Sequence, residues 1–329
     1  MLNNSSLDLL KDKKNLLAFS HGVDSTALFF LLKKLDIKFD IAIVDYGLRE
    51  QSKDEVNSAK KLANTYKLNC HIYEAKKIDK NFEAKAREIR YTFFEELIQK
   101  YTYDNLLTAH HLGDRFEWML MQFCKGAGCV EIAGMKEIQE KQNYTLIRPL
   151  LHLDKSELLF YLKQNDIKYF EDDTNLDDKY TRNRFRNNHT NPLLKEYLNG
   201  IKKSFEYLDE DLRSLIKDVE VTKIKDFAYF LSTKDIRNDI YIIDKYLKSN
   251  SYMLSAHERE LLKNKKTVVV GRKFIVTLHQ NMIFIAPHIN IDINMPKEFK
   301  EKMRKLKIEP KLRTYFFTNS ELFESLELE

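Results

Sequence analysis

The chain has 329 residues, of which 43% are hydrophobic and 32% are charged, and its formal net charge is +5. This length exceeds what one ordinary core accommodates, which predicts two domains, and the composition excludes a disordered chain. The charge is too small to indicate a nucleic-acid-binding protein by itself.

The first half of the chain alternates short apolar runs with helix-like segments. The runs have the length of strands and lie at 16–20, 41–45, 70–74 and 105–109. Helical spacing of apolar residues predicts helices at 25–35, 52–68 and 81–101. This alternation predicts an α/β domain with a parallel sheet covered by helices on both faces. Ligands bind beyond the carboxyl ends of such strands. The polar residues at or just past these ends are Ser20, Asp45, Glu74 and His110.

The second half of the chain changes character. A helix is predicted at 154–167, and the polar and charged segment 171–192 is too long for an idle connection, so we interpret it as a functional loop. Helix-like segments follow, and β-branched residues at 265–287 predict a hairpin. These changes predict an N-terminal domain at 1–192 and a smaller helical or α+β domain at 193–329.

Cysteine content and hydropathy bear on where the protein works. The three cysteines form no CxxC pair, which excludes a disulfide framework and fits a reducing cytosol. The N-terminus lacks the apolar core of a signal peptide, and no apolar run is long enough to cross a bilayer. We therefore expect a cytoplasmic protein without membrane contact.

The sequence SHGVDS follows the first predicted strand and opens a helix. Such a turn exposes backbone N–H groups and a positive dipole end, which bind phosphate, although a plain capped turn has the same outline. The sequence resembles the SGGxDS signature of the PP-loop ATP pyrophosphatases, with His21 in place of the second glycine. The resemblance implies a PP-loop fold of the adenine-nucleotide α-hydrolase type. It also implies an ATP site formed by Ser20, His21, Gly22, Val23, Asp24 and Ser25. Asp24 offers a hard oxygen ligand for Mg²⁺.

Further segments resemble one PP-loop branch, the tRNA(Ile)-lysidine synthetases, over about the first 190 residues. They occur in the family's order. Tyr46 stands where the family has histidine. The segments are VDYGLR (44–49), NFEAKAREIRY (81–91), TAHHLGDRFEWMLMQFCKGAG (108–128), IRPLL (147–151) and EDDTNLDDKYTRNRFRN (171–187).

The segment AHHLGDRFE places His110, Asp114 and Glu117 on one face of a helix. A metal site and a solvated helix start are both open readings of this pattern. The family resemblance implies instead that Asp114 and Glu117 hold a lysine substrate. Either His110 or His111 contacts ATP or carries a proton, and the sequence does not decide between them.

Arginines form a second group of candidates. TRNRFRN contains Arg182, Arg184 and Arg186, and guanidinium groups suit both transferring phosphates and an RNA backbone, although a charge run is often only solvated. We assign Arg184 a catalytic role and Arg182 and Arg186 contacts with tRNA. Arg87 and Arg90 have two equally supported interpretations. They contact tRNA, as the resemblance implies, or they are ordinary surface residues of an amphipathic helix.

The family resemblance implies a ligase that uses ATP and Mg²⁺. The 2-carbonyl oxygen of the wobble cytidine, in an isoleucine tRNA with a CAU anticodon, would attack the α-phosphate and release pyrophosphate. The amine of free L-lysine would then displace AMP to give lysidine. Asp45, at a strand end, would hold the nucleotide or metal or simply end the strand.

Domains 1–192 and 193–329 would then serve ATP-dependent catalysis and tRNA binding, respectively. The segment 295–313 carries eight Lys or Arg and three Glu and is a candidate RNA contact. A homodimer is compatible with the sequence. A tRNA thiolase, a small-molecule amide synthetase and a non-catalytic tRNA-binding protein are the alternatives, and ATP–pyrophosphate exchange with and without tRNA and lysine would separate them.

Overall fold

The structure is a computed structural model that describes residues 1–47, 50–78, 80–170, 181–217, 219–291 and 293–326. It divides into two compact units, Met1–Glu210 and Asp211–Glu329, which we call the N-terminal unit and the C-terminal unit and describe separately. The predicted division of function at residue 192 stays a prediction. No described helix is long and apolar enough to cross a bilayer.

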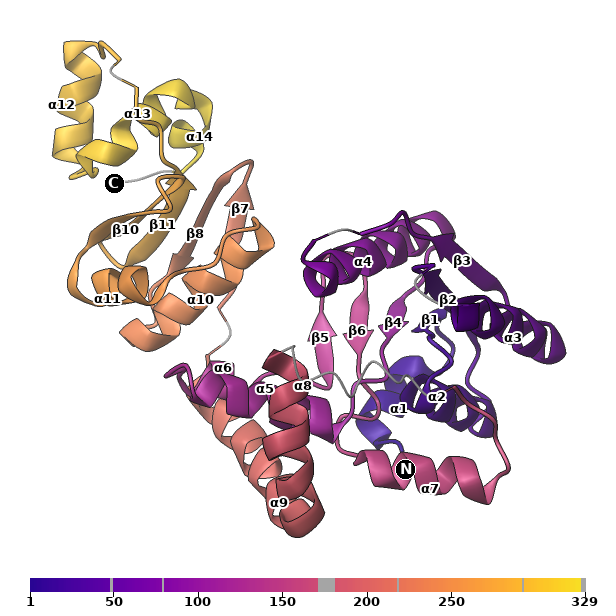
Figure 1. Ribbon diagram of the computed structural model, residues 1–329. Helices are drawn as coiled ribbons and strands as arrows, with labels where there is room; N and C mark the ends of the chain where they lie inside the picture. The colour runs from indigo at the N-terminus through magenta and orange to yellow at the C-terminus, as the bar shows by residue number, and fades with distance from the viewer. Residues whose placement is uncertain (48–49, 79, 171–180, 218, 292, 327–329) are drawn as a thin grey trace. The chain divides into compact units, whose positions relative to one another are not determined.

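The N-terminal unit is built on a six-stranded sheet with the order β3-β2-β1-β4-β6-β5 (Figure 1). Neighbouring strands are parallel except β5 and β6 at one edge, so the predicted parallel sheet is confirmed. The β5–β6 pair was not predicted, because strands this short show no readable period. The strands are β1 (Asn15–Ala18), β2 (Phe39–Asp45), β3 (Cys70–Glu74), β4 (Asn105–Leu107), β5 (Ile138–Glu140) and β6 (Thr145–Ile147).

The helices of the N-terminal unit are α1 (Asn4–Leu10), α2 (Val23–Lys34), α3 (Glu50–Tyr66), α4 (Phe82–Tyr101), α5 (Leu112–Phe123), α6 (Cys129–Ala133), α7 (Lys155–Gln164), α8 (Thr181–Phe185) and most of α9 (Asn191–Leu215). Helices lie on both faces of the sheet, whereas α5 and α9 pack against each other in a separate cluster. A π-helical turn, η2 (Arg186–Thr190), joins α8 to α9. Part of the predicted loop, 171–180, lies outside the described residues. From residue 181 the loop interpretation is wrong, because this stretch is helical.

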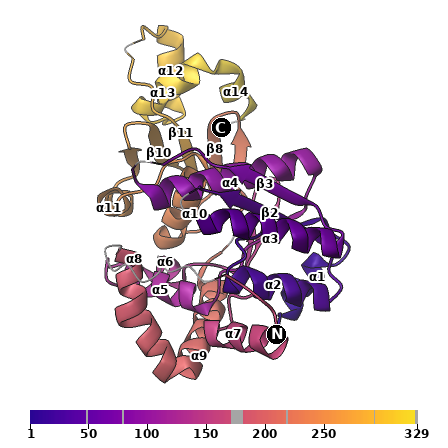
Figure 2. The ribbon, with the colours of Figure 1, turned by 45° about the vertical axis from the view of Figure 1, so that its right-hand side comes forward.

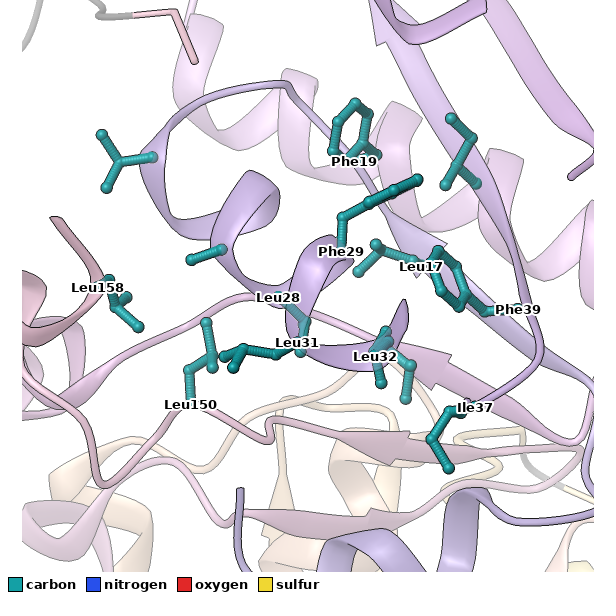
Figure 3. Close-up of a cluster of buried hydrophobic side chains, with 14 of the residues drawn as sticks. Leu17, Phe19, Leu28, Phe29, Leu31, Leu32, Ile37, Phe39, Leu150 and Leu158 are labelled. Carbon is teal, nitrogen blue, oxygen red and sulfur yellow. The ribbon is translucent and has the colours of Figure 1, made fainter. Parts of the chain in front are cut away.

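Two buried clusters lie on the two faces of the sheet. Successive strand residues point to opposite faces, so Leu17 packs with α1, α2, α3 and α7, whereas Leu16 packs with α4. Figure 2 shows α4 on one side of the sheet and α2 and α7 on the other. In Figure 3, Phe29 of α2 lies beside Leu17 and Phe19, and the rings of Phe19 and Phe29 are 5.7 Å apart. This core fixes the start of α2 at the end of β1.

The C-terminal unit contains an antiparallel sheet with the order β7-β8-β11-β10-β9. Helices α10 and α11 pack on one face, and α12, α13 and α14 pack on the other. The predicted hairpin at 265–287 is in fact three consecutive strands. The elements are β7 (Thr222–Ile224), β8 (Phe227–Leu231), α10 (Ile236–Ser249), α11 (Ala256–Asn264), β9 (Thr267–Val270), β10 (Phe274–His279), β11 (Met282–Pro287), α12 (Lys297–Lys305), α13 (Pro310–Thr318) and α14 (Ser320–Ser325).

Candidate active site

Two serines hold the turn between β1 and α2. The Ser20 N–H donates to Ser25 Oγ at 3.2 Å, and Ser25 Oγ donates to the Gly22 carbonyl at 3.2 Å. Gly22 caps α2, which begins at Val23, and has no side chain that could occupy the N–H groups of the first turn. A helix N-terminus of this kind attracts anions through its N–H groups and its dipole. The turn therefore has the geometry of a phosphate site.

His21, in place of the family's glycine, is buried and 4% exposed. Its backbone is left-handed, with φ 61°, a conformation that favours glycine. The imidazole Nε2 lies 2.9 Å from Ser58 Oγ on α3, and the ring contacts Phe19 and Phe170 at centroid distances of 5.0 and 5.1 Å. Burial lowers the pKa of His21, so the ring is neutral. These contacts compensate for the strained backbone and make the ring part of the interior.

Asp24 lies in the first turn of α2. Its Oδ1 is buried and has no hydrogen-bond partner among the described residues, and burial raises the pKa of this carboxyl group. Its Oδ2 lies 3.8 Å from His111 Nε2. Mg²⁺ in nucleotide sites is held by one or two carboxylates together with phosphates and water. An unsatisfied, hard oxygen beside a phosphate site fits that requirement.

His111 links the turn to α5. It caps this helix, because His111 Nδ1 accepts the Gly113 N–H at 3.0 Å while Asp114 Oδ2 accepts the His111 N–H at 3.1 Å. An accepting Nδ1 leaves the ring proton on Nε2. That N–H faces Asp24 Oδ2 and, at 3.7 Å, Asp114 Oδ2. His111 is therefore the histidine next to the phosphate site.

His110 has a different environment. Its Nδ1 lies 2.9 Å from Thr108 Oγ1. Burial lowers the pKa of His110 to about 4, against an opposing effect of Asp114, so the ring is neutral at physiological pH. Among the described residues, His, Cys, Asp and Glu form no group of three that could hold a metal ion, which contradicts the reading of His110, Asp114 and Glu117 as a metal site.

Asp114 and Glu117 are paired with two arginines. Glu117, 1% exposed, accepts a hydrogen bond from Nε of Arg182 and another, at 2.8 Å, from Nε of Arg186. Asp114 Oδ1 accepts longer bonds from the same two guanidiniums, at 3.4 and 3.3 Å. Burial alone would raise the pKa of Asp114, but His111, His110 and the arginines hold it well below its usual range. Both carboxylates thus lie in one cluster of charges with the two arginines, and Arg182 also pairs with Glu83 at 3.4 Å.

The remaining candidate arginines lie outside this cluster. Arg184 is exposed, since it is two residues from both Arg182 and Arg186 and so points to another side of the helix. Arg87 is exposed and stacks on the ring of Tyr91 at 4.7 Å, and Arg90 is exposed as well. Their predicted roles stay predictions, but the geometry favours Arg182 and Arg186 over Arg184 as site residues.

Asp45 and Tyr46 follow β2. Asp45 Oδ1 accepts the Gly47 N–H at 2.8 Å, which is the bond of a local turn. The Tyr46 hydroxyl donates to the Ala86 carbonyl at 2.9 Å, and its ring contacts Phe82 at 5.5 Å. Tyr46, at the family's histidine position, therefore attaches β2 to the start of α4.

Two residues of the site were missed by the sequence analysis. A Cβ on Gly113 would lie 2.7 Å from Cε1 of His111, so only glycine leaves room for the capping imidazole. A glycine in the first turn of a predicted helix was a readable signal of such a close approach. Ser58, which bonds His21, lies within an ordinary amphipathic helix, and nothing in its sequence neighbourhood indicated its role.

Known proteins resemble this chain over most of its length. Residues 2–193 match a family model described as a PP-loop domain. A tRNA(Ile)-lysidine synthase of Helicobacter pylori is 41% identical over 94% of this chain and 91% of that protein. Those of Campylobacter jejuni (41% identical, 95% of each chain) and Wolinella succinogenes (42% identical, 94% of each chain) are similar to the same extent.

A solved structure shares the fold. The U34-tRNA thiolase NcsA from Methanococcus maripaludis superposes with a TM-score of 0.53 at 20% identity. The match covers 64% of this chain and 75% of that one. At this identity the similarity concerns the fold alone.

Proposed function

Because this chain belongs to the tRNA(Ile)-lysidine synthase family of PP-loop enzymes, we propose that the site at the ends of β1 and β4 joins lysine to tRNA in an ATP-dependent reaction. The chain is a ligase that forms a carbon–nitrogen bond. Its nucleic-acid substrate is tRNA(Ile), and the atom modified is C2 of the wobble cytidine in the CAU anticodon. The products besides lysidine are AMP and pyrophosphate.

A tRNA thiolase is the alternative, and it is not favoured. The relatives at 41–42% identity are named lysidine synthases, whereas the similarity to the thiolase is at 20% identity. The cysteines Cys70, Cys124 and Cys129 take part in no group of three metal ligands within the described part of the chain.

We place ATP with its phosphates at the N-terminus of α2. Ser20, Gly22 and Ser25 shape this turn, and the N–H groups after Gly22 face the phosphate charge. Asp24 would hold Mg²⁺ through its unsatisfied Oδ1. Bound there, the ion would offset the negative charge of the phosphates and of the departing pyrophosphate.

In the first step the cytidine O2 forms a bond to the α-phosphorus, and the bond from that phosphorus to the β-phosphate oxygen breaks. Pyrophosphate leaves with the electron pair, toward the N–H groups of α2. The cytidine must leave its stack to reach the site, as it does in other enzymes that act on bases. Arg182 and Arg186 supply the positive charge nearest the carboxylates of α5.

In the second step the lysine amine, after its ammonium form has lost a proton to water, attacks C2. The bond from C2 to the adenylate oxygen breaks with its electron pair on that oxygen, which releases AMP, and the new nitrogen bond is completed by loss of a second proton to water. We assign the amine to Asp114. Its contacts with the arginines, at 3.3 and 3.4 Å, are longer than the 2.7–2.9 Å of a strong charge-assisted bond, so an ammonium can replace them. Glu117, with a bond of 2.8 Å to Arg186, keeps the arginines in place.

The remaining assignments concern the two domains and residues outside the cluster around Asp114. We place catalysis in residues 1–192 and tRNA contacts in residues 193–329, with Arg87, Arg90 and Arg184 as further RNA contacts and Asp45 beside the nucleotide. The reaction takes place in the cytoplasm, where tRNA is modified. A homodimer stays a prediction.

The observation that carries the proposal is the link through His111 between Asp24 and Asp114, 3.8 and 3.7 Å from the same Nε2. The test incubates the full chain with ATP, radiolabelled lysine and a tRNA(Ile) transcript with a CAU anticodon. We expect tRNA-bound label and equal amounts of AMP and pyrophosphate, all lost in Asp24→Asn. Label without ATP consumption, or full activity in Asp24→Asn, would refute the proposal.

A further inference from the structure

Trp118 is the only tryptophan in the chain, and it lies on α5 one helical turn beyond Asp114. Residues four apart share a face of a helix, so the two side chains emerge on the same side, about 6 Å apart along the axis. Trp118 is 43% exposed. A large aromatic group therefore stands at the surface beside the proposed lysine site.

The indole is held in place by the segment around α6. Its Nε1–H donates to the Glu131 carbonyl at 3.0 Å. A Cβ on Gly134, where φ is +69°, would lie 2.5 Å from Cδ1 of Trp118, so the backbone there is shaped around the ring. Arg115 Nε fixes the same segment by donating to the Ala133 carbonyl at 3.1 Å. The exposed ring is therefore oriented before any ligand arrives.

Packing of the hydrophobic core does not account for this arrangement. The core under α5 consists of Leu112 and Phe116 with Leu194 and Phe205 of α9, and Trp118 is not part of it. The exposed part of the indole gains nothing from burial. Because the ring is already oriented, a ligand that stacks on it incurs little further loss of side-chain entropy.

We propose that Trp118 is a stacking platform for a base of the tRNA that neighbours the modified cytidine; this inference rests on the proposed function. Bases of single-stranded RNA loops bind by stacking on aromatic side chains. The short distance to Asp114 along α5 places the platform next to the reacting base. Exposed cations on the flanking segments, Lys125 after α5 and Arg184 on α8, are suited to the adjoining phosphates.

The first test uses the fluorescence of this single tryptophan. The wild-type full chain is titrated with the tRNA(Ile) transcript, and complex formation is measured in parallel by filter binding. Stacking of a base quenches indole emission, so we expect emission to fall in step with binding. ATP and lysine without tRNA should leave the emission unchanged. Complex formation with unchanged emission would overturn the platform.

The second test uses variants. Trp118→Ala should weaken tRNA binding about 5- to 150-fold, the range for loss of one stacked base. Trp118→Phe should retain most of the affinity, whereas Trp118→Leu, which fills space without a π-face, should lose it as Trp118→Ala does. The KM for ATP should stay within about twofold, because the nucleotide lies at α2. Phe160→Ala on α7, an aromatic residue that is 63% exposed, is the matched control and should bind tRNA as wild type does.

The outcomes separate the two proposals. If the wild type attaches lysine to tRNA while Trp118→Leu binds tRNA normally, the platform is refuted and the proposed function stands. If the wild type binds tRNA with quenching but attaches no lysine, the proposed function fails and the platform stands. Circular dichroism of each variant excludes loss of folding as the cause, and the fluorescence titration needs no variant.

Discussion

The left-handed backbone of His21 leads to an inverted order of stability between two variants. At most positions alanine is more stable than glycine by about 0.4–1 kcal/mol, because glycine gives the unfolded chain more freedom. His21 has φ 61°, a left-handed conformation that destabilises the folded state of an L-residue by about 1–2 kcal/mol. We therefore expect His21→Gly to be more stable than His21→Ala by about 1 kcal/mol.

The side-chain losses cancel in this comparison. Both variants lose the ring contacts with Phe19 and Phe170 and the bond to Ser58, together about 3 kcal/mol. Ser58→Ala by itself leaves the buried Nε2 without this partner and should cost about 1–3 kcal/mol. Combining it with His21→Ala should cost less than the sum, because the two residues share one hydrogen bond.

Urea unfolding followed by tryptophan emission measures these differences. The single tryptophan, Trp118, lies in the N-terminal unit, so its emission reports on the unit that contains His21. With a slope of about 2 kcal/mol per M, the expected difference moves the midpoint by about 0.5 M. If His21→Ala equals or exceeds His21→Gly in stability, the backbone at this position is not strained and the reasoning is wrong.

The remaining predictions concern the site itself. Asp114→Asn should raise the KM for lysine at least about tenfold, with a much smaller change in tRNA adenylation; an unchanged lysine titration would remove the assigned role. Gly113→Ala should displace the His111 ring and lower kcat while the protein stays folded, as steady-state kinetics and circular dichroism can check. His110, whose pKa of about 4 lies below its unfolded value of 6.5, binds its proton more readily in the unfolded chain. Stability should therefore fall on acidification from pH 6.5 to 4, by up to about 1.4 kcal/mol per pH unit, and less steeply in His110→Gln.

The parallel sheet and the position of the site could be predicted from the sequence because their signals are local. Each buried strand is a short apolar run, and each helix shows its own period. In the structure the run at 70–74 is β3, and the segment from Ser20 to Ser25 lies at the predicted turn into α2. Spacing alone placed His110, Asp114 and Glu117 on one helix face. Asp114 and Glu117 do lie on α5, but the helix begins at Leu112, so the prediction is wrong for His110, which precedes it.

The roles within the site depended on contacts between distant segments. The polar segment around Arg182 has no apolar period, so the sequence predicted a loop there. In the structure the segment is helical and forms ion pairs with α5. The helical turn brings Arg182 and Arg186 to Glu117 and leaves Arg184 exposed. His110 and His111 are adjacent in the chain but have different hydrogen-bond partners, Thr108 for His110 and the Gly113 N–H for His111. These partners follow from the tertiary structure around each ring. Local periodicity can be read directly from the sequence. The partner of a polar side chain depends instead on which distant segment the fold brings within hydrogen-bonding distance.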